Sequence, residues 1–332
     1  MIHGIKSLDY ISFKRSQLSM VNGNFSRYIS SISRGKARGL HPYFVTGFLD
    51  AECSFIISIV LNNKYKTGWR IDPHFSIELH GKDLLLLKQI QSFFGVGSII
   101  VRKSNNQVIF TVTSIKDLTI KIIPHFEKYP LITQKRADYL LFKSVVYLMN
   151  RKEHLTQDGL RQIVGLRAAM NTGLSEKQKA AFPNIIPAVR PTGYARGVVN
   201  PQWVAGFTTG EGCFIVRLLN SSSNRISHVA LVFQITQHQR DEQLMRSLIE
   251  YFSCGKVYKR NDAYDFRVSK YSDLTNKIIP FFQNYPIQGV KHRDYLDWCK
   301  AADLMKENHH LTEEGLEKIK KIKSNMNKSR EL

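Results

Sequence analysis

Two glutamates, Glu52 and Glu211, stand near the ends of two similar segments, "VTGFLDAEC" at 45–53 and "VAGFTTGEG" at 204–212. Before each glutamate, small residues recur four positions apart, a spacing that lets two helix backbones approach closely. If the two helices pack together, both carboxylates come to the same end of the pair. Acids are unfavourable at a helix C-terminus and beside each other, so this arrangement needs a compensating cation. Carboxylate and carbonyl oxygens suit Mg²⁺, and the pattern therefore predicts a divalent metal site.

The elements that must position these glutamates come in two copies. Five segments recur in the same order, at offsets from 156 residues (121 to 277) to 159 residues (45 to 204). Each copy has a short helix, two alternating strands, an amphipathic helix, a second hairpin and further helices, an αββαββα unit. We predict an α+β fold in which two pseudo-symmetric repeats form a saddle of two curved antiparallel sheets, with helices on the outer face.

The domain boundaries follow from the repeats and from composition. We expect a basic, Ser-rich leader at 1–40, a first repeat at 41–164, a linker rich in Pro, Gly and Ala at 165–199, and a second repeat at 200–328. The leader is similar to a mitochondrial transit peptide, although a flexible leader without a targeting role fits its composition equally well. The first reading predicts a location in the mitochondrial matrix.

The charge of the chain points to a polyanionic partner. Lys and Arg number 48 against 27 Asp and Glu, a net charge of +21, and the basic excess runs through both repeats. A distributed excess fits a long face that binds double-stranded DNA. The apolar stretches are of strand length, too short to span a membrane, so no membrane partner is expected. The four cysteines have neither zinc-ligand spacing nor the density of a disulfide framework.

The alternating strands have one apolar face and one mixed face. Phe55 and Ile57 suit a core, whereas Ser54 and Ser58 between them point to the other face. A sheet with such a face fits a DNA major groove, where Arg pairs with guanine and Gln with adenine. The DNA-facing candidates are Ser54, Ile56, Ser58, Lys64, Arg70, Asp72, His74, Ser76, Glu78, Ser98, Ile100, Arg102, Thr111 and Thr113 in the first copy, and Cys213, Ile215, Arg217, Ala230, Val232, Gln234, Thr236, Lys256, Tyr258, Arg260 and Arg267 in the second.

Several segments together carry a family resemblance: "LDAECSF", "FTTGEGCF", "LITQKRADY", "AAFPNII" and "LVFQITQH". From about residue 41 to 328 the chain resembles the LAGLIDADG homing endonucleases, in particular the single-chain, two-repeat type encoded in fungal mitochondrial group I introns. The resemblance implies metal-dependent phosphodiester hydrolysis and a double-strand break in a pseudo-palindromic target of roughly 20 bp. It also implies that the cut promotes mobility of the intron.

The resemblance assigns roles to particular residues. Glu52 and Glu211 would be the catalytic acids and would bind the metal, with the carbonyls of Ala51 and Gly210 completing its shell. Mg²⁺ is the expected ion, Mn²⁺ should replace it, and Ca²⁺ should support binding without cleavage. A chain with both repeats should act as a monomer without an obligate protein partner.

Two positions depart from the family pattern. Cys53 stands where Gly212 keeps the final glycine of the motif, and Thr209 stands where Asp50 keeps an acid. Basic side chains near the acids should organise water and neutralise charge. The candidates are Lys103, Lys256 and Lys259, with Gln234 as a polar partner.

Two alternative functions are compatible with the same features. A maturase that helps its host group I intron RNA to fold would also be basic and could keep both acids. A nuclease-inactive DNA-binding protein could use the same saddle, although loss of a motif acid would be expected there, and both acids are present. Cleavage of the intron-less target, as opposed to stimulation of splicing, separates these hypotheses.

Overall fold

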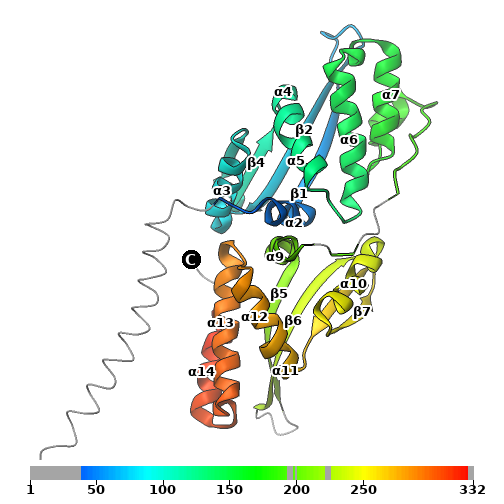
Figure 1. Cartoon of the computed structure of the whole chain (residues 1–332). Coiled ribbons are helices and arrows are strands. Elements are labelled where there is room, and N and C mark those ends of the chain that lie inside the picture. The colour runs from blue at the N-terminus through cyan, green and yellow to red at the C-terminus, as the bar shows by residue number, and fades with distance from the viewer. Residues whose placement is uncertain (1–38, 193–196, 199, 221–225, 328–332) are drawn as a thin grey trace, which may run out of the picture. The chain divides into compact units, whose positions relative to one another are not determined.

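The computed structural model describes residues 39–192, 197–198, 200–220 and 226–327, so the predicted leader lies almost entirely outside the described residues. From His41 onward the chain repeats one order of elements, which confirms the predicted α+β fold (Figure 1). The first repeat and the segment after it contain α2 (Pro42–Glu52), β1 (Cys53–Leu61), β2 (Trp69–His80), α3 (Leu84–Phe94), β3 (Ser98–Arg102), β4 (Gln107–Val112), α4 (Ile115–Asp117), α5 (Ile123–Lys128), α6 (Lys135–Asn150), α7 (Gln157–Ala168) and α8 (Glu176–Ala181). The second contains α9 (Pro201–Glu211), β5 (Gly212–Asn220), β6 (Ile226–His238), α10 (Glu242–Phe252), β7 (Lys256–Arg260), β8 (Ala263–Val268), α11 (Tyr271–Asp273), α12 (Ile279–Asn284), α13 (Gly289–Lys306) and α14 (Glu313–Ser324).

Each repeat builds one antiparallel sheet of four strands, in the order β1-β2-β4-β3 and β5-β6-β8-β7. Buried residues alternate with more exposed ones along β1, and Phe55 pairs with Phe75 on β2. Phe214 and Phe233 form the equivalent pair in the second sheet. These buried aromatic side chains pack under the helices, so one face of each sheet is core and the other is left for contacts outside the repeat.

The helices α2 and α9 pack side by side between the two sheets (Figure 1). Both begin with proline in the first turn, after a capping residue whose side chain accepts a backbone hydrogen bond. A Cβ on Gly47 would collide with the carbonyl oxygen of Trp203, and one on Gly206 would collide with that of Phe44. Because only glycine allows this approach, these two positions define the seam between the repeats.

The predicted linker has structure of its own. Its first residues belong to the end of α7, which runs to Ala168, and α8 lies within it. Further on, Arg190 donates two hydrogen bonds to the carboxylate of Asp138, at 2.8 and 3.1 Å. The ring of Phe182 packs against Trp69 of the first repeat. The connection between the repeats is therefore anchored on the first repeat.

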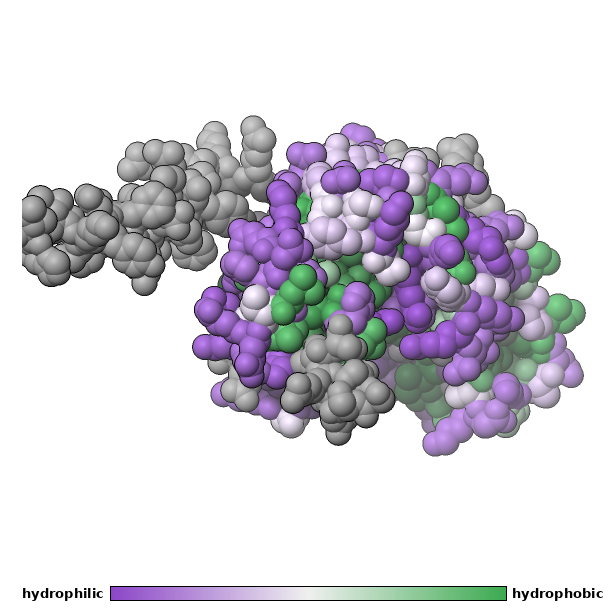
Figure 2. Space-filling model, turned by 90° about the horizontal axis from the view of Figure 1, so that it is seen from below, coloured by the Kyte–Doolittle hydropathy of each residue, from purple (hydrophilic) through white to green (hydrophobic). Residues whose placement is uncertain are grey.

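The surface agrees with the composition. Hydrophilic side chains cover most of the described surface seen in Figure 2, with apolar side chains in smaller patches between them. No helix in the described ranges has the length and apolar character needed to cross a membrane.

Candidate functional site

Glu52 and Glu211 are the last residues of α2 and α9, and each sheet begins at the next residue. The two helix ends are so close that a Cβ on Gly210 would lie 3.1 Å from Glu52 Oε1. Burial and, after it, the charge of Glu52 raise the pKa of Glu211 to about 7. Burial also raises the pKa of Glu52. The fold therefore brings two buried carboxylates together where the charge of Glu52 disfavours ionisation of Glu211.

Two lysines that the sequence analysis did not single out lie beside these carboxylates. Lys135 begins α6, and its Nζ donates to the carbonyls of Leu49 (3.2 Å) and Ala51 (2.9 Å). Lys291, at the equivalent position in α13, donates to the carbonyl of Gly210. Burial lowers the pKa of Lys291, and the nearby glutamates oppose this effect. The recurrence of the lysine in "LITQKRADY" and "IQGVKHRDY" is the sequence signal that identifies both.

The three lysines that we expected near Glu52 and Glu211 lie elsewhere in the structure. Lys103 follows β3, and Lys256 and Lys259 lie on β7, and both strands are the sheet edges opposite β1 and β5. In the register of the second sheet, Lys256 lies three strands from Cys213, a separation of about 14 Å. Alternation along a strand predicts which face a side chain occupies, but it gives no information on strand order.

The polar partner also differs from the expected one. Gln234 lies in the middle of β6 and donates from Nε2 to Thr236 Oγ1 at 3.0 Å. The glutamine that hydrogen-bonds Glu211 is Gln237, three residues further along the same strand. Cys53 adopts an ordinary extended conformation, with φ −83° and ψ 160°, so its departure from the motif glycine introduces no backbone strain.

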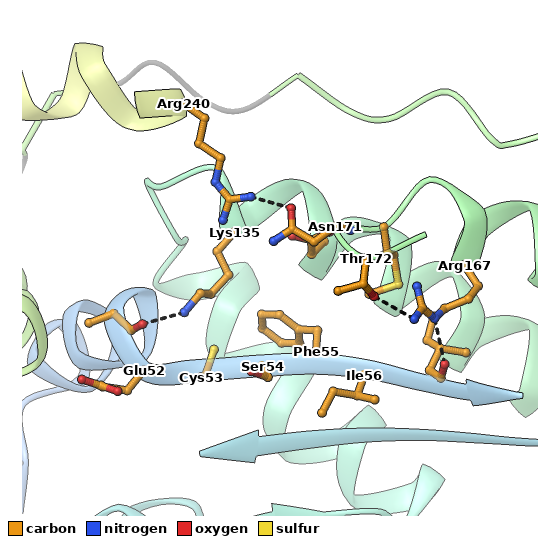
Figure 3. Close-up of a pocket in the computed structure, with 14 residues that line it drawn as sticks. Glu52, Cys53, Ser54, Phe55, Ile56, Lys135, Arg167, Asn171, Thr172 and Arg240 are labelled. Atoms are coloured by element: carbon orange, nitrogen blue, oxygen red, sulfur yellow. Dashed lines mark hydrogen bonds between the residues drawn. The ribbon is translucent and has the colours of Figure 1, made fainter. Parts of the chain in front are cut away.

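A pocket of about 350 Å³ opens beside Glu52 (Figure 3). Lys135 reaches into it from α6, and Arg167 lies at its far end, held by hydrogen bonds to main-chain and side-chain oxygens. Arg240, from the second repeat, donates to Asn171 across the pocket. The pocket is lined by Lys135, Arg167 and Arg240, and three cationic groups along one pocket suit a phosphate group.

Comparison with known proteins assigns the fold to a family. The family model described as LAGLIDADG endonuclease matches residues 45–146 and, a second time, residues 204–302. The chain belongs to the LAGLIDADG endonuclease family. Both matched ranges include one motif helix and its glutamate, so the family's repeats coincide with the two observed in the structure.

Curated relatives of this LAGLIDADG chain include two from Neurospora crassa, named probable intron-encoded endonucleases 3 and 2. They are 42% and 41% identical to it, over 89% and 87% of the chain. Since the matches cover 55% and 65% of these relatives, the chain spans between half and two thirds of their length. An uncharacterized 50.9 kDa protein in ND4 intron 1 of Podospora anserina is 44% identical over 36% of the chain and 26% of that protein.

Solved structures with the same LAGLIDADG fold include two meganucleases with DNA. I-SmaMI bound to an uncleaved DNA target in the presence of calcium ions is 47% identical, with a TM-score of 0.84 over 87% of this chain and 99% of that one. I-CpaMI bound to uncleaved DNA is 44% identical, with a TM-score of 0.83 over 87% of this chain and 99% of that one. I-SmaMI has also been solved with cleaved DNA.

The side chains predicted to face DNA lie on the sheet faces opposite the two LAGLIDADG cores, or in the adjoining turns. Arg70 and Asp72 form an ion pair of 2.7 Å on this face. Val232 needs correction, because its side chain is only 2% exposed. It pairs with Ile215 and lies beneath the surface of this face, so we remove it from the predicted interface.

The second sheet carries a buried carboxylate that the sequence analysis missed. Asp265 is fully buried although it lies on the face predicted to contact DNA. It accepts hydrogen bonds from Thr236 Oγ1 (2.7 Å) and from the guanidinium of Arg267. That guanidinium lies 5.3 Å from the ring centroid of Tyr258. Its Nε is buried and has no hydrogen-bond partner among the described residues. Arg267 is therefore held by Asp265 and still has one N–H group available as a donor.

Proposed function

We propose that the chain is a site-specific DNA endonuclease that makes a double-strand break. The observation that carries this proposal is the pairing of Glu52 and Glu211 at the ends of two seam helices, each with its own lysine and its own sheet. One carboxylate for each DNA strand gives two cuts from one chain, which therefore acts as a monomer. The DNA-bound structures of I-SmaMI support this assignment.

The residues at the helix ends fit a hard divalent cation, and we propose Mg²⁺, with Mn²⁺ as a substitute and Ca²⁺ supporting binding alone. The donors are two carboxylates and the carbonyls of Ala51 and Gly210, all oxygen. Both carbonyls already accept a lysine ammonium, so this oxygen cluster attracts positive charge. The described residues contain no group of three or more His, Cys, Asp or Glu that could hold a metal, so water and phosphate oxygens would complete the shell. When bound, the ion would polarise the phosphate and acidify a water.

The chain's own groups supply the remaining chemistry. The ammonium groups of Lys135 and Lys291 stand at the helix ends, where they stabilise negative charge that develops on a phosphate. Burial lowers the pKa of Lys291, which brings its Nζ closer to the range where it can exchange a proton with water. Arg167 and Arg240 neutralise the DNA backbone at the edge of the pocket.

The wider biological role follows from the same proposal. Two sheets, each along about one helical turn, would read a target of roughly 20 bp through the face opposite the cores. The intron-encoded relatives support a role in intron mobility, and the relative in an ND4 intron supports a mitochondrial location. The alternative function, a maturase with host intron RNA as its partner, stays a hypothesis.

Selection of a target from DNA of unknown sequence tests the function. Sites from a randomised library are enriched by binding in Ca²⁺ and then incubated with Mg²⁺, Mn²⁺ or EDTA. We expect one family of long sites, cut on both strands with Mg²⁺ or Mn²⁺ and intact with Ca²⁺ or EDTA. Cutting in EDTA contradicts the metal assignment, and bound sites that are never cut contradict the endonuclease.

A further inference from the structure

Two aspartates at equivalent positions each form a hydrogen bond with the other repeat. Asp83 stands just before α3, and Asp241 just before α10. The amide of Val290, in the second repeat, donates to Asp83 Oδ1 at 2.9 Å. The amide of Gln134, in the first repeat, donates to Asp241 Oδ1 at 2.7 Å. The two bonds are related by the pseudo-symmetry of the repeats.

The donors of these bonds immediately precede the two lysines of the site. Gln134 comes before Lys135, and Val290 comes before Lys291. The first amides of a helix lack partners inside it, and a carboxylate there also complements the helix dipole. Gln134 and Gln288, the residues directly before α6 and α13, make no side-chain cap. Thr133 Oγ1 accepts from the amide of Lys135 at 3.2 Å, and the start of each helix also has a hydrogen bond to an aspartate of the opposite repeat.

The surroundings of both aspartates are built for this contact. Asp241 is only 5% exposed, so its carboxylate is committed to the protein interior. Asp83 lines a pocket of about 300 Å³ together with Glu52 and Lys291. A Cβ on Gly289 would lie 2.6 Å from Asp83 Oδ1, and Gly289 has a φ of +67°. Glycine at this position therefore permits both the turn and the approach of the aspartate.

We propose that Asp83 and Asp241 are positioning residues, each of which holds the lysine of the opposite repeat beside the paired glutamates. Asp241 fixes the start of α6 and with it Lys135, and Asp83 fixes the start of α13 and with it Lys291. The glutamate and lysine of one repeat are then correctly placed only when the other repeat is docked against them. This inference rests on the proposed endonuclease function for its effect on cleavage, but the caps themselves are independent of that function.

Strand-resolved cleavage separates positioning from simple stabilisation. The enriched site is labelled on both strands and cut with Mg²⁺ by wild type, Asp83→Ala, Asp241→Ala, Lys135→Met and Lys291→Met. We expect Asp241→Ala to slow cleavage of the same DNA strand as Lys135→Met does. Asp83→Ala should slow cleavage of the same DNA strand as Lys291→Met does. A misplaced catalytic group costs on the order of 10- to 100-fold, so nicked DNA should accumulate. Glu242→Gln, at a half-buried neighbour paired with Arg246, should leave cleavage of both DNA strands unchanged.

Hydrogen exchange provides a second readout that needs neither metal nor DNA. Asp241→Ala should lose amide protection in 131–138 and keep it in 286–293, and Asp83→Ala should show the reverse. Asp83→Asn and Asp241→Asn keep an accepting oxygen and lose only the charge, so each should show a smaller loss at the same segment and on the same DNA strand, and they serve where an alanine variant does not fold. Equal slowing of both strands, or unchanged exchange at both segments, overturns the inference. If the wild-type protein binds its sites without cutting them, the proposed function is overturned instead. Hydrogen exchange alone then tests whether the two aspartates cap the helices.

Discussion

The two repeats agree where they meet and differ where they face outward. At the seam, glycines, glutamates, lysines and capping aspartates occupy matching positions. On the sheets, Asp265 and Arg267 of the second repeat stand where the first repeat has Ile109 and Thr111. The seam positions the paired glutamates and lysines for both repeats. Each sheet face, in contrast, can diverge to bind its own half of a DNA target. We infer that most seam residues match because both copies use them in the same way, whereas the outward sheet faces are free to differ.

The glycines of the seam give the strongest test of this symmetry. Gly47→Leu and Gly206→Leu each force a side chain into the main chain of the opposite helix, and overpacking of this kind costs about 3 kcal/mol. We expect both variants to lose a similar amount of stability, measured by urea unfolding. The same substitution on an exposed helix costs less than about 1 kcal/mol. Unchanged stability in either variant contradicts a shared seam.

Asp50 and Thr209, at equivalent positions in the two motif helices, break the symmetry within the seam. Buried Asp50 accepts hydrogen bonds from Ile132, from Thr133 and from Trp203 Nε1 of the second repeat, whereas Thr209 accepts one from Gln288. Asp50→Ala leaves several buried donors unpaired and should cost about 3 to 5 kcal/mol. Thr209→Val should cost about 1 kcal/mol. Thermal melts of both variants compare them directly, and equal losses contradict the asymmetric role of Asp50.

A buried histidine distinguishes the cores. His125 hydrogen-bonds Thr46 and stands where the second repeat has Phe281, and burial lowers its pKa to about 4. The folded state disfavours protonation, so wild-type stability falls as pH drops from 6.5 towards 4. His125→Phe removes this loss, and we expect the stability of the variant relative to wild type to rise by about 2 kcal/mol between pH 7.5 and 4.5. Thermal melts across this range measure it, and a difference that does not change with pH contradicts the assignment.

The sheet faces should differ in how strictly they read DNA. Asp265→Asn keeps the volume but weakens the ion pair that holds Arg267, so discrimination at one base pair should fall about tenfold. The matched control, Ile109→Val in the first sheet, should leave selectivity unchanged. Sites enriched by each variant from the same library are sequenced and compared. Loss of selectivity spread evenly over both half-sites contradicts a local role for Asp265.

The sequence predicted the architecture and the glutamate pair because both depend on collinear recurrence, which survives divergence of the side chains between. Recurrence marks Lys135 and Lys291 as equivalent residues, but it does not show that Lys135 lies beside a glutamate 83 residues earlier, so the lysine was not assigned to the site. Alternation placed Val232 on the correct face but does not indicate how deep a short side chain lies. The cross-repeat caps depend on how the repeats dock, which no single segment encodes.

Strand-resolved cleavage by Glu52→Gln, Glu211→Gln and the double variant tests the central claim most directly. Glutamine keeps the shape of the side chain and removes the charge that would hold the metal. Binding in Ca²⁺ should stay within about threefold of wild type because it rests on the sheets and phosphate contacts. Each single variant should lose double-strand breaks, and the double variant should cut neither strand. Double-strand breaks at the wild-type rate from either single variant would show that this carboxylate is not part of the cleavage site.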